Sequence, residues 1–263
     1  MSQTLHIERL VDEQTFGRFN LSVLWWSFLA MLADGFDISA LASAAPALAA
    51  AWHIPPKSFG PAFSASLFGI LFGAPLLGLV GDRVGRRVAI ISGCVIYGLG
   101  TLATVRAANL DQMIVLRFVT GIGIGGLMPN TIALNSELSP KRLRATLIVL
   151  MFTGITTGSG LPGYIQAWLI PRYGWPIMFW IGGLAPLLIA GCLMVRLPES
   201  VKYLRSRPER RGEMLATLRR MRRDLSIADD AAIVSTPAMP ASGSGLEQLF
   251  SREFFGGVKW ICR

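Results

Sequence analysis

The sequence predicts an all-α transmembrane fold in which six helices cross a lipid bilayer. Of its 263 residues, 52% are hydrophobic and 16% are charged, and the hydrophobic residues gather in longer runs than a soluble domain contains. A helix needs about 20 residues to cross a hydrocarbon core of about 30 Å. Six segments meet or approach this length: residues 21–50, 58–80, 88–105, 111–134, 145–170 and 175–197.

The positive charges predict the orientation of the six spans. Arginine and lysine gather before span one, between spans two and three, between spans four and five, and after span six. The other connections carry only Lys57, Arg106 and Arg172. Because positive residues favour cytoplasmic connections, we expect a multi-pass protein of the cell inner membrane with both ends in the cytoplasm. Residues 1–20 would form a cytoplasmic amino terminus, 21–200 the six-helix bundle and 201–263 a cytoplasmic basic tail.

Span one contains two aspartates, Asp34 and Asp37. A carboxylate inside a span costs about 2.5 to 3.5 kcal/mol on insertion scales, so both side chains should face protein or water. Residues three apart share a helical face and are separated by about 4.5 Å along the axis. Like charges this close favour the binding of a proton by one of them. Asp34, nearer the bilayer midplane, is the better candidate, and the alternative is a packing pair without a transport role.

A turn rich in glycine and arginine joins spans two and three. It contains the candidate residues Gly78, Asp82, Arg83, Gly85, Arg86 and Arg87. Gly85 permits a positive φ, Gly78 and Gly81 allow close helix approach, and Asp82 can accept hydrogen bonds or lie at a helix amino terminus. An ordinary positively charged connection explains the three arginines but neither the glycine spacing nor the aspartate. The pattern therefore indicates a specialised turn.

Arg117 in span four is predicted to lie at the depth of Asp37. Span one runs outward from Leu21, which places Asp37 about 6 to 9 Å below the outer surface. Span four runs inward from Asp111, which places Arg117 about 9 Å below the same surface. We expect Arg117 to neutralise Asp37 or to alternate between Asp37 and a substrate carboxylate. The alternative is a snorkelling or purely structural arginine.

Pairs of small residues predict close contacts between the spans. The pattern G-x-x-x-G occurs at Gly69 and Gly73, at Gly121 and Gly125, and at Gly154 and Gly158. Glycines at this spacing let two helical backbones approach each other.

These features together resemble the major facilitator superfamily. The arrangement G-x-x-x-D-R-x-G-R-R at residues 78–87 is similar to its cytoplasmic signature, which helps to latch the inner gate, although Val80 and Gly81 replace the commoner Leu-Ala pair. Arg117, Gly121 and Gly125 match the family's R-x-x-x-G-x-x-x-G of span four. The resemblance implies the six-helix amino-terminal bundle of such a transporter, built as two inverted three-helix repeats.

Two further turns carry the same resemblance, which extends to about Leu204. Glu137, Pro140 and Arg144 are similar to the family's turn after span four. Pro198-Glu199-Ser200 is similar to the motif that closes span six.

Within the superfamily, the tetrad Asp34-Gly35-Phe36-Asp37 and the triplet Met128-Pro129-Asn130 look like the aromatic acid:proton symporter family. This resemblance implies secondary active symport of a small aromatic carboxylate, such as 4-hydroxybenzoate, with protons. Asp34, Asp37 and Arg117 would be the proton-coupling and substrate residues. The alternatives are a sugar or other organic-acid porter, or a non-transporting membrane protein from a truncated gene.

Beyond span six, Met214, Leu218, Met221 and Leu225 recur at helical spacing among arginines and predict an amphipathic basic helix. We interpret it as a linker, with the inner leaflet or nucleic acid as alternative partners. Near the end, the apolar residues are Phe254, Phe255, Val258, Trp260 and Ile261, and this run is far too short to cross a bilayer. We therefore expect a truncated half, which needs a carboxy-terminal half or a second copy to enclose a substrate.

No pattern predicts an enzyme, a metal site or a cofactor. His6 and His53 are too few and too peripheral for metal binding or acid-base catalysis. A phosphate-binding loop ending in Lys-Ser or Lys-Thr is also missing, which argues against ATP-driven pumping. The arginines lack the interleaved aromatic residues of a nucleic-acid site.

Overall fold

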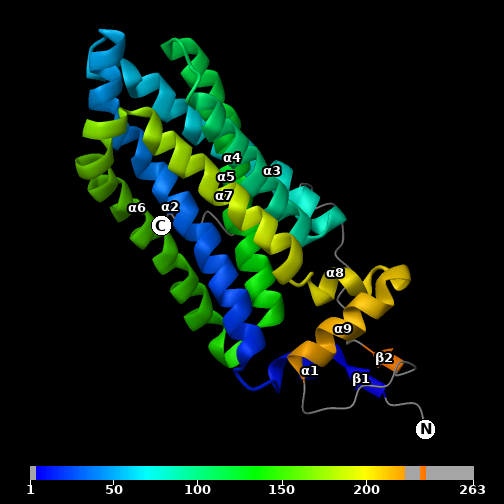
Figure 1. Ribbon diagram of the computed structural model, residues 1–263. Coiled ribbons are helices and arrows are strands. Elements are labelled where there is room, and N and C mark those ends of the chain that lie inside the picture. The colour runs from blue at the N-terminus through cyan, green and yellow to red at the C-terminus, as the bar shows by residue number, and fades with distance from the viewer. Residues whose placement is uncertain (1–3, 223–231, 235–263) are drawn as a thin grey trace, which may run out of the picture.

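The computed structural model describes residues 4–222 and 232–234 and consists mainly of a bundle of long helices (Figure 1). Within these residues, six helices are long and apolar enough to cross a membrane. They are α2 (Arg18–Trp52), α3 (Gly60–Val84), α4 (Arg86–Thr104), α5 (Leu110–Leu138), α6 (Lys141–Tyr173) and α7 (Pro176–Arg196). The predicted six-helix fold is therefore confirmed, and most helices extend a few residues beyond the predicted spans.

Local residue chemistry sets several helix ends. Gly85 separates α3 from α4 with φ of 123°, so its predicted positive φ is confirmed. The Asn109 side chain accepts a hydrogen bond of 2.9 Å from the Gln112 N–H and caps the start of α5. Gly174, with φ of 74°, ends α6.

Short elements gather at one end of the bundle. They are β1 (Thr4–His6), α1 (Ile7–Asp12), α8 (Val201–Arg205), η2 (Pro208–Arg210), α9 (Arg211–Met221) and β2 (Ala232–Val234). Another short element, η1 (Pro56–Phe59), lies between α2 and α3 and is not part of this group. Figure 1 shows α1, α8, α9 and both strands at this end, which we call the basic end because it also carries the arginine-rich turns. The two strands pair in parallel, a feature that the sequence did not predict.

The predicted amphipathic helix is α9. Met214, Leu215, Leu218 and Met221 are buried and join a core cluster that also contains Leu10. The apolar face of α9 therefore packs on the protein. The helix ends at Met221, and the rest of the predicted segment lies outside the described residues.

The segment before α2 is packed against the bundle rather than free. The Gln14 amide is buried and donates a hydrogen bond of 2.9 Å to the Leu138 carbonyl at the end of α5. The Asp12 carboxylate pairs with the Lys141 ammonium at 2.9 Å and accepts a hydrogen bond from the Lys141 backbone N–H at 3.3 Å. These contacts satisfy backbone groups at the α5–α6 turn that a helix end leaves open.

Glycines allow two pairs of helices to touch through their backbones, as the G-x-x-x-G pattern predicts. A Cβ added at Gly69 of α3 would lie 2.9 Å from the Gly121 Cα of α5, and one added at Gly73 would lie 2.7 Å from the Ile122 Cα. On α6, Gly154 and Gly158 meet the backbone of α2 in the same way. Any larger residue would push these helices apart.

We predict that Gly73→Ala lowers the free energy of unfolding by about 1 to 3 kcal/mol, because the added methyl overlaps the Ile122 backbone. Gly191 on α7 is the matched control, since none of the described neighbouring residues has an atom within 4 Å of a Cβ built there. Gly191→Ala should leave stability unchanged or raise it by up to about 1 kcal/mol through helix propensity. Denaturant unfolding of the detergent-solubilised chain, followed by circular dichroism, measures both, and equal effects would refute the packing account.

Candidate functional site

Arg117 and Asp37 form an ion pair inside the bundle. Arg117 Nη1 donates to Asp37 Oδ1 at 3.0 Å and to Oδ2 at 3.2 Å. The relative exposure of Arg117 is 0% and that of Asp37 is 5%. The contact that the depth arithmetic predicted is therefore present. Removing either partner would leave an uncompensated buried charge, which is strongly unfavourable.

Three threonines and a phenylalanine complete the surroundings of Arg117. Its Nη2 donates to the hydroxyls of Thr101 at 3.2 Å, Thr104 at 3.1 Å and Thr120 at 3.4 Å. The guanidinium carbon lies 5.4 Å from the centroid of the Phe179 ring, within cation–π range. We call Asp37, Thr101, Thr104, Thr120 and Phe179 the arginine cage. It is built from α2, α4, α5 and α7.

Sequence reasoning missed these threonines. Thr101 and Thr104 are three residues apart on α4, and Thr120 follows Arg117 by three residues on α5, so each spacing places two side chains on one helical face. That spacing was the available signal. It is weak because threonine is common in membrane spans, where its hydroxyl can bond its own helix.

The cage lies between two apolar layers of the core. Toward the basic end, one cluster of buried side chains includes Ala33, Tyr97 and Ile124. Beyond the cage, a second cluster includes Ala40 and Met113. The charged pair is therefore enclosed by apolar side chains along the bundle axis, and its electrostatic interactions are weakly screened.

Asp34 has different surroundings from Asp37. Its relative exposure is 4%, yet its Oδ1 has no hydrogen-bond partner among the described residues. The nearby Tyr97 hydroxyl donates to the Ala33 carbonyl at 2.7 Å instead. A buried carboxylate without a partner carries a large desolvation cost. The structure thus places on one face of α2 a carboxyl group that pairs with Arg117 and another with a buried oxygen that lacks a hydrogen-bond partner in the described ranges.

Gly85 and Glu199 join the two motifs at the basic end. Glu199 Oε1 accepts hydrogen bonds from the backbone N–H of Arg87 at 3.1 Å and of Ser200 at 2.9 Å. A Cβ added at Gly85 would lie 2.8 Å from Glu199 Cδ. Glycine is therefore required at position 85 for its positive φ and for the room that the Glu199 carboxyl group occupies.

Asp82 and Arg86 link the turn to α5. Arg86 donates to Asp82 Oδ1 at 2.5 Å and to Asn130 Oδ1 at 3.1 Å. Asn130 in turn donates to the Leu77 carbonyl at 3.0 Å, so the Met128-Pro129-Asn130 triplet holds the end of α3. The close approach predicted for Gly81 is confirmed, because a Cβ built there would lie 2.9 Å from Asn130 Cγ of α5. The close approach predicted for Gly78 is wrong for the part of the chain that the structure describes, because nothing lies within 4 Å of a Cβ built there.

Four other predicted residues lie at the same end of the bundle. Arg87 donates to the Met194 carbonyl, Glu137 accepts from the Ser200 hydroxyl, and the carbonyl of exposed Arg83 accepts from Arg207 at 3.3 Å. Arg144 is half-buried, and its Nε has no partner within the described ranges. No hydrogen bond or ion pair joins it to Glu137 there.

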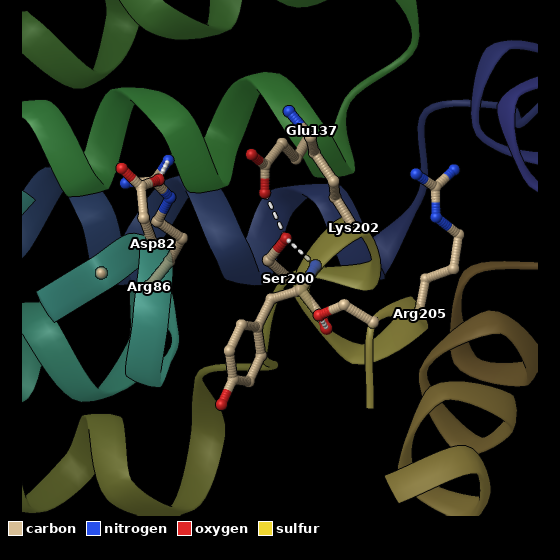
Figure 2. Close-up of a pocket in the computed structure, with 9 residues that line it drawn as sticks. Asp82, Arg86, Glu137, Ser200, Lys202 and Arg205 are labelled. Atoms are coloured by element: carbon tan, nitrogen blue, oxygen red, sulfur yellow. Dashed lines mark hydrogen bonds and ion pairs between the residues drawn. The ribbon is translucent and has the colours of Figure 1, made fainter. Parts of the chain in front are cut away.

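A pocket of about 250 Å³ opens between these motifs. Figure 2 shows Glu137 and Ser200 pointing toward each other at its centre, with Asp82 and Arg86 on one side and Lys202 and Arg205 on the other. Both charge signs line this pocket. Across residues 4–222 and 232–234, no group of three or more His, Cys, Asp or Glu side chains is placed to hold a metal ion.

Comparison with known proteins gives consistent matches. A family model described as the Major Facilitator Superfamily matches residues 27–261. The 4-hydroxybenzoate transporter PcaK of Pseudomonas putida is 41% identical over 204 residues, which cover 78% of this chain and 46% of that protein. A gallate transporter of Pseudomonas putida is 36% identical over 217 residues, covering 82% and 48% respectively. The chain thus spans about half the length of the curated relatives that it matches.

A solved structure supports the fold. The xylose transporter XylE from E. coli, in a partially occluded inward open conformation, has a TM-score of 0.66 over 77% of this chain and 55% of that one. Its sequence identity is 21%, so this likeness concerns the fold alone.

We predict a pH-dependent contribution of Glu199 to stability. Burial raises the pKa of the Glu199 carboxyl above its ordinary value, and the N–H groups of Ser200 and Arg87 partly offset this rise. Because the folded state then holds the proton more tightly than the unfolded chain, this contribution is present below the unfolded pKa. It is lost as the pH rises through the raised, folded-state pKa.

Glu199→Gln should remove this loss, since an amide does not titrate and its oxygen can still accept both N–H groups. The stability of the variant relative to wild type should therefore grow as the pH rises from about 4, near the ordinary pKa of glutamate. Thermal unfolding of both proteins across this pH range tests the prediction. Curves that stay parallel would show that Glu199 does not contribute in this way.

Proposed function

Because the chain belongs to the major facilitator superfamily, we propose that it forms the amino-terminal bundle of a proton-coupled symporter for small aromatic carboxylates such as 4-hydroxybenzoate. The family and the fold are those of transporters rather than enzymes. Relatives at 36–41% identity are named as transporters of 4-hydroxybenzoate and gallate, which supports this substrate class.

The buried pair of Asp37 and Arg117 carries the proposal. A charged pair at 3.0 Å between two membrane helices is energetically costly and therefore rare, and such pairs often mark proton relays or substrate pathways. When a proton neutralises Asp37, the positive charge of Arg117 loses its counter-ion. A substrate carboxylate can then replace that counter-ion, so proton binding and anion binding become favourable together.

Asp34 supplies the second half of this mechanism. Its unpaired oxygen lies on the same helical face as Asp37, three residues away. We assign Asp34 as the site that takes up the proton and passes it to Asp37, one helical turn away, where neutralisation removes the counter-ion of Arg117. The same carboxyl groups would otherwise be an unexplained cost of the fold.

The turn at residues 78–87 would act as a latch at the cytoplasmic side. This role places the basic end in the cytoplasm of a multi-pass protein of the cell inner membrane, as the positive charges favour. Gly85, Glu199 and Ser200 lock the α3–α4 turn to the start of α8. Asp82, exposed over 60% of its side chain, remains accessible to a facing unit.

The proposal includes a second six-helix unit, because transporters of this type bind substrate between two halves. Large apolar side chains are exposed along α3, among them Leu67, Phe68, Leu71 and Phe72. A carboxy-terminal half or a second copy of the chain, together with lipid, would cover such a surface.

Uptake into proteoliposomes tests the proposed function. The chain, alone or with the separately produced carboxy-terminal half of the Pseudomonas putida relative, should take up labelled 4-hydroxybenzoate faster when the outside is acidic. Asp34→Asn and Asp37→Asn should each reduce this stimulation at least about tenfold, equivalent to about 1.4 kcal/mol.

Asp111→Asn is the matched control, because Asp111 is an exposed carboxylate in the first turn of α5. It should retain the stimulation of uptake. Absence of gradient-dependent uptake in both preparations would reject symport and leave a non-transporting membrane protein. Equal uptake of xylose would favour a sugar porter.

A further inference from the structure

Two threonines of the arginine cage are fixed as hydrogen-bond acceptors. A hydroxyl group can donate one hydrogen bond and accept two. Thr104 donates to the Gly100 carbonyl at 3.0 Å, and Thr120 donates to the Leu116 carbonyl at 2.9 Å. Each hydroxyl hydrogen is therefore bonded to a carbonyl of the threonine's own helix. Both hydroxyl oxygens can then only accept hydrogen bonds from Arg117.

Thr101 is bonded differently. Its hydroxyl donates to Asp37 Oδ1 at 3.3 Å and accepts from Arg117 Nη2 at 3.2 Å. This hydroxyl bridges the two charged groups, so its hydrogen bonds depend on the state of Asp37. The bonds of Thr104 and Thr120 to Arg117 do not, because no group in them belongs to Asp37.

We propose that Thr104 and Thr120 are positioning residues that hold the Arg117 guanidinium in the bundle when Asp37 is neutral, while Thr101 links the guanidinium to Asp37. The proposal rests on the symport function argued above. Within the described residues, Asp37 is the one carboxylate that pairs with Arg117. Without other acceptors, a guanidinium that lost this partner would extend toward water, as long cationic side chains do in membranes.

Retention of Arg117 has a consequence for substrate binding. A guanidinium that stays in place after Asp37 is neutralised presents a positive charge at a defined position to an arriving carboxylate. Arg117 Nε, buried and without a partner among the described residues, leaves one donor for that carboxylate. The Phe179 ring opposes displacement from the α7 side. Affinity for an anion is higher when the charge is preorganised in this way.

A thermal unfolding cycle on the full chain in detergent tests the proposal. Asp37→Asn represents the neutral carboxyl group, and the double change Thr104→Val and Thr120→Val removes the fixed acceptors with little change in shape. We expect the double change to lower Tm at least about twice as much in the Asp37→Asn background as in wild type, because contacting groups are not additive. Thr104→Ser and Thr120→Ser, which keep the hydroxyls, should restore Tm.

Thr131→Val is the matched control. Thr131 is buried on α5 and bonds the Leu127 carbonyl of its own helix at 2.6 Å, without a contact to Arg117 in any described range. Its replacement should cost the same in both backgrounds. An equal or smaller loss for the Thr104 and Thr120 change in the Asp37→Asn background would overturn the proposal.

Transport kinetics separate positioning from a merely structural role. The change Thr104→Val and Thr120→Val should raise the KM for 4-hydroxybenzoate about tenfold and leave Vmax within about twofold, since it weakens anion binding. A lower Vmax at unchanged KM would overturn positioning, because it indicates less folded protein. The unfolding cycle does not require transport, so a chain without uptake would reject the symport function while the cycle still decides the role of the threonines.

Discussion

A guanidinium within a membrane-spanning bundle is stable only where protein groups replace the water that it has lost. Arg117 meets this requirement through Asp37 on α2, three threonine hydroxyls on α4 and α5, and the Phe179 ring on α7. Together with Arg117 itself on α5, these groups involve four helices. The Arg117 charge therefore constrains the relative positions of these helices, and the packing elsewhere in the fold must be compatible with those positions.

Glycine contacts and apolar layers keep the helices around Arg117 in place. Glycines hold α3 close to α5, which carries Arg117, and α6 close to α2, which carries Asp37, and apolar clusters on both sides keep the charged pair away from water. At the basic end, Gly85 and Glu199 fix a second contact, between the α3–α4 turn and the segment before α8. The raised pKa of the Glu199 carboxyl group makes the stability of this contact sensitive to pH. The contacts of Arg117 inside the bundle and the contacts of Glu199 with the α3–α4 turn are thus two separate stabilising features of the same bundle.

Much of this arrangement can be predicted from the sequence, because membrane insertion requires long apolar runs and makes charged residues within them rare. The lengths of the apolar runs predict six spans, and the uneven distribution of positive charges distinguishes the two ends of the bundle. Because charged side chains inside a membrane span are costly, Asp37 and Arg117 at the same depth could be predicted to pair. Thr101, Thr104 and Thr120 could not be predicted, since a neutral hydroxyl that bonds its own helix leaves no such signal. The pairing of β1 with β2 and the open space around Gly78 depend on tertiary contacts that local patterns do not encode.

The central claim is that Asp37 and Arg117 stabilise each other inside the bundle, and a double-mutant cycle measures this most directly. Free energies of unfolding in detergent are compared for wild type, Asp37→Asn, Arg117→Met and the double variant. Each single change should cost about 3 to 5 kcal/mol, because it leaves a buried polar or charged group without its partner. The double variant should cost clearly less than the sum, with a coupling of about 2 kcal/mol or more. Additive costs would contradict the account.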